Sequence, residues 1–268
     1  MTMTQAALVN HTFLTYFIPW DQFKGTYNPT IYNSYTEKYI ELTKNKHSQL
    51  SADFETDYLF VNDAEYCISL FEKHNLKRFG ANDLFNIKFL LLEEYFEKYD
   101  AITYIDFDVV QVGTPTRDQI ENLKTHECAI RHTPSNPEYL VHKNVKRLCE
   151  FFDVPYIQDD VFTNNNGVFT ISKEGWKKLD YLNSLRKIYN HLDEQFSSEL
   201  CDESLFNFIR LLSQVPVTNL DEQFNSFARS REEYIRLDKN DFRMIHFSKD
   251  TGKQVLNELL FDPNSILY

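Results

Sequence analysis

The sequence predicts an α/β protein with a mainly parallel central sheet flanked by helices, and three observations lead to this prediction. Short apolar, β-branched runs alternate with longer segments whose apolar residues recur at helical spacing, which is typical of strand–helix–strand units. An acidic pair follows one of these runs directly, where a parallel sheet binds its ligands. The chain has 268 residues, of which 42% are hydrophobic, and this is enough for one large domain.

The first half of the chain contains three expected strands, each ending in polar residues or a loop. These strands are expected at residues 11–19, 57–61 and 101–105. The first is followed by a polar, aromatic loop through residue 33. Helices are expected at residues 34–46, 64–74 and 82–98, and Asp83 is a suitable cap for the last of them.

The second half continues the alternation of strands and helices. Strands are expected at residues 128–131, 167–172, 215–218 and 243–247. Helices are expected at residues 139–152 and 198–212, and over most of residues 173–194. There is no internal repeat, linker-like stretch or charge block, so we expect one continuous domain over residues 1–268.

Composition excludes several classes of function. The chain has 28 basic and 40 acidic residues, a net charge of -12, and this argues against a protein that binds nucleic acid or an anionic membrane. The four cysteines are scattered, which favours reduced thiols in a cytosol-like compartment. No apolar run reaches the roughly 20 residues of a transmembrane helix, and the first residues lack the basic region of a signal peptide. We therefore expect a soluble, cytoplasmic protein without a transmembrane segment.

The most informative stretch is AITYIDFDVVQVGTP, in which Asp106 and Asp108 directly follow an apolar strand. Two carboxylates at such a position repel each other and lose solvation, so a positive group is needed to compensate them. Carboxylate oxygens two residues apart suit Mg²⁺ or Mn²⁺, ions that also bind phosphate oxygens. A solvated turn after the strand is the simpler alternative.

One enzyme class with such a pair is the haloacid-dehalogenase-like phosphatases. The sequence DFDVV fits their Asp-x-Asp-x-Thr/Val pattern, in which Asp106 would be the nucleophile and Mg²⁺ the cofactor. That pattern usually lies on the first strand of the fold, whereas about a hundred residues with their own α/β pattern come first here. No later Gly-Asp pair follows, so the rest of the chain fits this class poorly.

Four blocks of the sequence resemble the retaining glycosyltransferases of family 8, which have the GT-A fold. In chain order they are YIDFDVVQVGTP, TNNNGVFTISKEGWKKL, CDESLFN and MIHFSKDTGK. The resemblance implies a Rossmann-like GT-A domain, with a nucleotide-binding half over about residues 1–110. A half that binds donor sugar and acceptor would cover about residues 111–268. It also implies a UDP-sugar donor and retention of the anomeric configuration.

The resemblance assigns a metal site and contacts to the donor diphosphate. Asp106, Asp108 and His246 would hold Mn²⁺, with Mg²⁺ as the alternative, although a histidine in a late strand is more often a packed core residue. Lys88 is the only charge in the run FNIKFLLL, so it either contacts the donor or extends its ammonium group to solvent. Lys249 and Lys253 compete for a phosphate contact, because the Lys-Pro-Trp of the family is absent here.

The resemblance also assigns the sugar site. Its residues match the Asn-x-Gly block, the acidic residue that binds a sugar hydroxyl and the position beside the anomeric carbon, and they are Asn165, Asn166, Gly167, Asp202 and Glu203. The family usually has Gln at the last position, and a carboxylate there could attack or stabilise an oxocarbenium-like centre. Two simpler alternatives remain open, a polar turn at the Asn-x-Gly block and an ordinary first-turn helix acid at Glu203.

Other features add less. Thr15 and Tyr16, at the end of the first strand, match the position that contacts uracil in the family. His126 and Cys128 would share one strand face, but no second spaced pair accompanies them, so a zinc site is not expected. The resemblance favours UDP-glucose or UDP-galactose as donor and a glycan or other hydroxyl acceptor, and a catalytically inert nucleotide-sugar-binding protein remains an alternative. The sequence does not indicate an oligomeric state.

Overall fold

The computed structural model describes residues 10–18, 37–78, 83–134, 139–192, 196, 199–262 and 265. Its centre is a six-stranded sheet in the order β2-β1-β3-β6-β5-β7. The strands are β1 (His11–Tyr16), β2 (Asp57–Val61), β3 (Ala101–Ile105), β5 (Cys128–Pro134), β6 (Phe162–Ser172) and β7 (Thr218–Asn219). All of them run in one direction except β6, which is antiparallel to both β3 and β5. The predicted α/β class with a mainly parallel sheet is confirmed.

A second, three-stranded sheet lies beside the first, in the order β4-β9-β8. It is built from β4 (Val109–Val112), β8 (Ser226–Phe227) and β9 (Arg243–His246). Strand β4 follows the acidic pair directly and is antiparallel to β9, which comes from the last part of the described chain. The small sheet therefore joins the middle of the chain to its carboxyl-terminal region.

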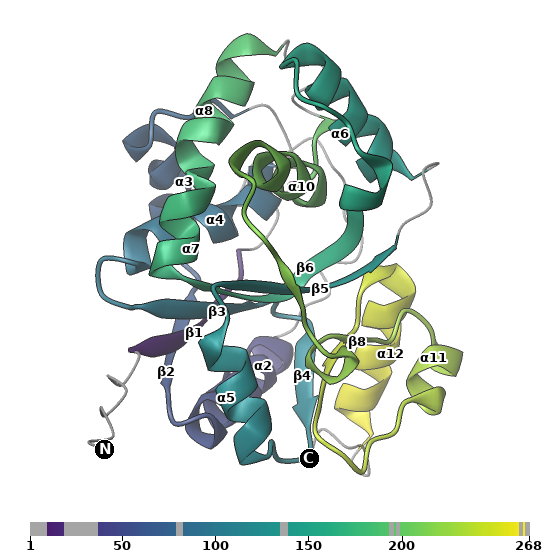
Figure 1. Cartoon of the computed structure of the whole chain (residues 1–268). Helices are drawn as coiled ribbons and strands as arrows, with labels where there is room; N and C mark the ends of the chain where they lie inside the picture. Colours follow the sequence, from purple (N-terminus) through teal and green to yellow (C-terminus); the bar gives the residue numbers. More distant parts are fainter. Residues whose placement is uncertain are drawn as a thin grey trace, which may run out of the picture.

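Helices cover both faces of the large sheet (Figure 1). On one face lie α3 (Ala64–Lys73), α4 (Asp83–Tyr95), α6 (Leu140–Phe151), α7 (Lys173–Leu179), α8 (Tyr181–His191) and α10 (Asp202–Ser213). On the other face lie α2 (Glu37–Asp53) and α5 (Arg117–Thr125). Beside the small sheet lie α11 (Arg231–Arg236) and α12 (Lys249–Phe261). Two single 3₁₀ turns, η2 (Gln158–Asp160) and η3 (Glu222–Phe224), complete the described elements.

The packing follows these layers. The largest apolar cluster lies between the large sheet and its upper helices, and there Phe89 of α4 stacks on Tyr181 with ring centroids 4.3 Å apart. A second cluster lies on the opposite face, and a third joins the small sheet to α12. Among the described helices, none is both long enough and apolar enough to cross a lipid bilayer.

Several predicted boundaries are wrong. The expected strand 215–218 is only the two-residue β7, because Pro216 lacks a backbone donor and Thr218 and Asn219 are exposed. The expected helix over 173–194 breaks into α7 and α8 at Asp180, whose φ of 48° is left-handed. The expected helix over 198–212 begins at Asp202 with Cys201 as its N-cap residue.

Other elements are longer than predicted or were not predicted. Strands β5 and β6 extend beyond 128–131 and 167–172 because they pair with each other, and β6 includes the polar TNNN run. Helix α2 continues to Asp53, and the loop expected through residue 33 lies outside the described residues. The elements that were not predicted are β4, β8, α5, α11 and α12.

Gly252 holds α12 close to the small sheet. A Cβ atom at this position would lie 2.4 Å from the carbonyl oxygen of Ala228 and 2.9 Å from the carbonyl carbon of Phe247. Both are backbone atoms, which cannot move aside as a flexible side chain can. The approach matters for the site described below, because Lys253 is the next residue.

We expect Gly252→Ala to lower the free energy of unfolding. Extra atoms in a packed interior cost about 1–3 kcal/mol, which outweighs the roughly 1 kcal/mol by which Ala favours a helix over Gly. Urea unfolding followed by circular dichroism measures the difference. Gln254→Ala, on the exposed side of the same helix, is the control and should change little. A stabilised Gly252→Ala protein would contradict the close approach.

Candidate functional site

Backbone pairing brings the acidic pair and a distant histidine together. Asp106 follows β3, and its N–H donates to the carbonyl oxygen of Gly167 over 2.7 Å. The chain turns into β4, where Val109 lies opposite His246 of β9. The N–H of the residue after His246 then donates to the carbonyl oxygen of Asp108 over 3.0 Å. Backbone hydrogen bonds of β-sheet type on both sides of the turn therefore fix the positions of Asp106, Asp108 and His246.

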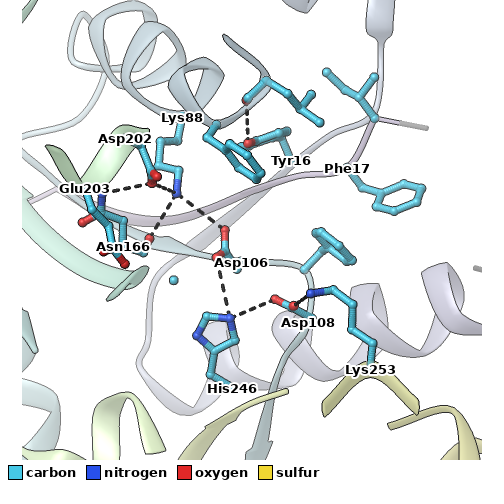
Figure 2. Close-up of a pocket in the computed structure, with 15 residues that line it drawn as sticks. Tyr16, Phe17, Lys88, Asp106, Asp108, Asn166, Asp202, Glu203, His246 and Lys253 are labelled. Atoms are coloured by element: carbon cyan, nitrogen blue, oxygen red, sulfur yellow. Dashed lines mark hydrogen bonds and ion pairs between the residues drawn. The ribbon is translucent and has the colours of Figure 1, made fainter. Parts of the chain in front are cut away.

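Asp106, Asp108 and His246 face one another with ligand atoms within 4.8 Å (Figure 2). The His246 Nε2 atom lies 3.3 Å from Asp108 Oδ1 and 3.8 Å from Asp106 Oδ2. Asp108 and His246 are buried, whereas Asp106 keeps about a quarter of its side chain exposed. Two carboxylates and one imidazole are a donor set that suits a divalent cation such as Mn²⁺. Among the described residues this is the one cluster with that geometry.

The contact made by the other nitrogen of the His246 ring also suits a bound cation. Its Nδ1 atom lies 3.2 Å from Oδ1 of Asn225, a fully buried residue. An amide oxygen accepts a hydrogen bond, so this contact favours the tautomer with hydrogen on Nδ1. The lone pair of Nε2 then faces the two carboxylates. That arrangement is repulsive without a positive charge between them, and a bound cation supplies it.

Two lysines neutralise the acidic pair from opposite sides. Lys253 Nζ lies 2.9 Å from Asp108 Oδ2, and Lys88 Nζ lies 3.9 Å from Asp106 Oδ1. Burial would raise the pKa of Asp108, but the positive charge of Lys253 opposes it most strongly and this pKa stays below its ordinary value. For Asp106, burial outweighs the opposing effect of Lys88, and its pKa is raised. The hydroxyl of Tyr104 also donates to Asp106 Oδ1 over 2.6 Å.

A second polar group lies on the other side of Lys88, around the start of α10. Asp202 Oδ2 accepts hydrogen bonds from Lys88 Nζ over 2.9 Å and from Asn166 Nδ2 over 3.0 Å. Burial would lower the pKa of Lys88, but Asp106 and Asp202 outweigh it and raise this pKa, so the lysine is charged. Lys88 therefore links the two groups electrostatically. Its ammonium group stays inside the protein and does not extend to solvent.

Glu203 follows Asp202 in the first turn of α10 and is partly buried. Burial, together with the negative charge of Asp202, raises the pKa of Glu203 to about 8. The carboxyl group is therefore largely protonated at neutral pH. Positive charge that develops nearby would favour its ionised form.

Both groups line one cavity of about 170 Å³. Its apolar walls come from the end of β1, the start of α4 and the turn after β3. The lining residues are Tyr16, Phe17, Ile18, Leu84, Phe85, Lys88, Asp106, Phe107, Asp108, Asn166, Gly167, Asp202, Glu203, His246 and Lys253.

Some predicted site residues do not reach this cavity. Thr15 is fully buried and its hydroxyl contacts His47, whereas Tyr16 lines the cavity and donates its hydroxyl hydrogen to the carbonyl oxygen of Leu84. Lys249 is exposed and is not among the lining residues, so Lys253 is the lysine that the structure brings to the site. Asn165 lies in β6, but its side chain is outside the described residues.

Sequence reasoning missed the supporting residues Asn225, Tyr104 and His47. His47 is fully buried on α2 and lies 2.6 Å, through Nε2, from the carbonyl oxygen of Val109, which follows Asp108. Burial lowers the pKa of His47 to about 4, so it is neutral. Side chains two residues apart on a strand point to the same face, so the position of Tyr104 two residues before Asp106 could have predicted this contact. The other two depend on contacts between distant segments.

The fold is that of known glycosyltransferases. Mouse xyloside xylosyltransferase 1, in its apo form, matches with a TM-score of 0.52 and 13% identity, over 91% of this chain and 99% of that chain. The galactosyltransferase LgtC, solved with donor and acceptor sugar analogues, matches with a TM-score of 0.51 and 11% identity, over 93% and 95%. An LgtC active-site mutant, in which Gln is replaced by Glu, gives 0.50 and 14% over 92% and 94%.

No protein-family model and no curated protein sequence matches the chain. The similarity to the solved structures covers nearly the whole chain and, at this identity, establishes the fold alone. The chain therefore has the GT-A fold that the sequence predicted.

We expect Mn²⁺ to stabilise the protein through the cluster of Asp106, Asp108 and His246. A ligand that binds only the folded state stabilises it by about 2.7 kcal/mol at 100 times its Kd. Asp108→Asn should abolish the Mn²⁺-dependent rise in melting temperature. Asp159→Asn, an exposed change of the same charge, is the control and should keep that rise. An unaltered response of Asp108→Asn to Mn²⁺ would place the ion elsewhere.

The raised pKa of Glu203 predicts a pH dependence of stability in the metal-free protein. The folded state holds this proton up to about pH 8, whereas the ordinary pKa is 4.5. Between these values the folded state binds more protons than the unfolded state, so the free energy of unfolding falls as pH rises. Glu203→Gln should flatten this part of the curve and should exceed the wild type in stability at pH 8. Urea unfolding at pH 5, 6.5 and 8 measures it, with the exposed first-turn variant Glu65→Gln as control.

Proposed function

We propose that this protein is a retaining glycosyltransferase that moves a hexose from a UDP-sugar to a hydroxyl acceptor. The donors we favour are UDP-glucose and UDP-galactose, and the acceptor is a glycan or another hydroxyl compound. One observation carries the proposal: a single cavity holds a cluster suited to a metal and a polar group suited to a sugar, joined by the buried Lys88. The GT-A fold supports it, because the similar structures are named as glycosyltransferases.

In this proposal the first group binds the diphosphate. Asp106, Asp108 and His246 would hold Mn²⁺, or Mg²⁺, which would neutralise the charge on the departing UDP. Lys88 and Lys253 lie beside the carboxylates and provide two buried positive charges close to the same place. Phosphate oxygens entering the cavity would compete for these ammonium groups. Tyr16 and Phe17, at the other wall, would pack against the nucleoside.

The second group binds the sugar. Asn166 and Gly167 offer amide and backbone groups to sugar hydroxyls, and Asp202 is oriented for the same task by two hydrogen bonds. Asn165 belongs to the same proposed contact surface, through a side chain that is outside the described residues.

Glu203 acts at the anomeric carbon in this proposal. Its protonated form is neither a nucleophile nor a counter-charge, and positive charge developing at the sugar would favour ionisation. Glu203 would release its proton to water, and its carboxylate would then attack or stabilise the anomeric carbon as the bond from that carbon to the UDP phosphate breaks. The acceptor hydroxyl would replace UDP on the same face, and the leaving phosphate would take the proton of that hydroxyl. One of the similar structures is an LgtC active-site mutant in which Glu replaces Gln.

The arrangement gives less support to a phosphatase. In that mechanism Asp106 would attack phosphorus, but its Oδ1 already accepts a hydrogen bond from Tyr104 and lies near Lys88. The strand after the acidic pair also leads to His246 and Lys253, groups that the phosphatase pattern does not require.

A donor screen tests the proposal. We expect UDP release from UDP-glucose or UDP-galactose in the presence of Mn²⁺, and its loss in EDTA and in Asp108→Asn. Lys253→Ala should lower kcat/KM for the donor about 10–100-fold, since a hydrogen bond to a charged group contributes about 1.5–3 kcal/mol. Lys249→Ala, at an exposed lysine outside the cavity, is the matched control and should leave kcat/KM unchanged.

The configuration of the product separates the remaining alternatives. Proton NMR of the transferred sugar should show the anomeric configuration of the donor. An inverted product would refute the retaining mechanism, and metal-independent UDP release would refute the proposed metal site. Donor binding without any turnover would identify an inert nucleotide-sugar-binding protein.

A further inference from the structure

Three arginines gather beside the cavity, in a chain whose net charge is -12. Arg131 lies on β5, Arg229 follows β8, and Arg243 begins β9. We call these residues the arginine cluster. None of the three lines the cavity described above, and the proposed function gives them no role. Arg131 and Arg229 lie against the ring of Phe227 on β8, and Arg243 contacts Ser226, the residue before it.

The arginine cluster is compact. The guanidinium carbons of Arg131 and Arg229 lie 5.0 Å and 4.9 Å from the centroid of the Phe227 ring. Arg243 donates to the hydroxyl of Ser226, the residue before this phenylalanine, over 3.2 Å. Burial, and the like charges of Arg229 and Arg243, lower the pKa of Arg131 against the opposing effect of Glu222. The positive charges of Arg229 and Arg243 are thus near enough to act on Arg131, and an anion bound beside the three guanidinium groups would offset their repulsion.

The protein itself neutralises the arginine cluster only in part. Arg131 donates to the backbone oxygen of Asn225, and its nearest carboxylate, the exposed Glu222, is 3.9 Å away. Arg229 lies 3.4 Å from Glu233. Arg243 donates to a backbone oxygen and to Ser226, and no carboxylate among the described residues forms an ion pair with it. Each guanidinium has five N–H donors, so these contacts leave donors for a ligand.

The arginine cluster adjoins the proposed reaction centre. Phe227 and His246 lie opposite each other in the parallel pair of β8 and β9, and their ring centroids are 5.9 Å apart. Arg131 reaches the same place from the large sheet and donates to Asn225, whose side chain contacts His246. One molecule could therefore place a charged group among the arginines and a hydroxyl group next to the cavity.

We propose that Arg131, Arg229 and Arg243 bind an anionic group of the acceptor, so that the acceptor is a sugar carrying a phosphate or a carboxylate. This inference rests on the proposed function, because it names the acceptor of that reaction. Planar guanidinium groups bind both kinds of anion with paired hydrogen bonds. The donor diphosphate is not the better candidate, because Lys88, Lys253 and the metal cluster already serve it inside the cavity.

Calorimetric binding without metal tests the assignment. The probes are glucose 6-phosphate, glucuronate and the neutral methyl glucoside. We expect at least one charged sugar to bind about ten times more tightly than the neutral one. A comparison of glucose 6-phosphate with glucuronate then shows whether the site prefers a phosphate or a carboxylate. Arg229→Gln should weaken charged-sugar binding about tenfold or more, in line with a charged hydrogen bond of about 1.5–3 kcal/mol.

The matched control is Arg231→Gln. Arg231 is an exposed arginine two residues further on that pairs with Glu258, so its loss should not change charged-sugar binding. Arg229 is the better test position than Arg131, because Arg131 also holds the backbone of Asn225. Equal binding of charged and neutral sugars, or an unaltered Arg229→Gln protein, would overturn the assignment.

Binding is measured without turnover, so this result is separate from that of the donor screen. If the protein transfers sugar to neutral acceptors and binds no charged sugar, the proposed function stands and the arginine cluster is not an acceptor site. If the wild type binds glucose 6-phosphate more tightly than Arg229→Gln does but UDP is never released, the anion site stands and the proposed function fails.

Discussion

The site depends on the antiparallel pairing of β4 with β9. Both groups that contact the Asp108 carboxylate, His246 and Lys253, come from the segment that this pairing brings in. Removing one partner of a buried ion pair costs about 3–5 kcal/mol. The pairing is therefore part of the electrostatics of the site as well as of its shape. Strands β4 and β9 both contribute buried apolar residues to the third cluster, which stabilises their pairing.

Charge at the site is distributed so that the buried acids of the two groups each face a lysine. Lys253 serves Asp108, and Lys88 lies between Asp106 and Asp202. This arrangement offsets the negative charge of the acids and leaves positive charge at the place proposed for a diphosphate. A chain with an excess of acidic residues can thus offer a local site for an anion.

The sequence supported the fold class well, because alternating periodicities are local signals, and the acidic pair was recognisable from its position after a strand. His246 was predicted as a metal ligand only because the block MIHFSKDTGK resembles one in the family 8 glycosyltransferases. Thr15 contacts His47 and does not line the cavity with Tyr16, because consecutive strand residues point to opposite faces. Asn225 and the arginine cluster could not be predicted, since strands distant in sequence bring them together.

The late position of β9 in the chain has a consequence for protein synthesis. Asp106 and Asp108 leave the ribosome long before the segment that supplies His246 and Lys253, at the usual rate of about 5–20 residues per second. During that interval β4 lacks its partner strand, and the two carboxylates stay in water. The large sheet can assemble first from β1, β2 and β3, but the end of the molecule that carries Asp106, Asp108 and His246 is complete only when translation has passed α12.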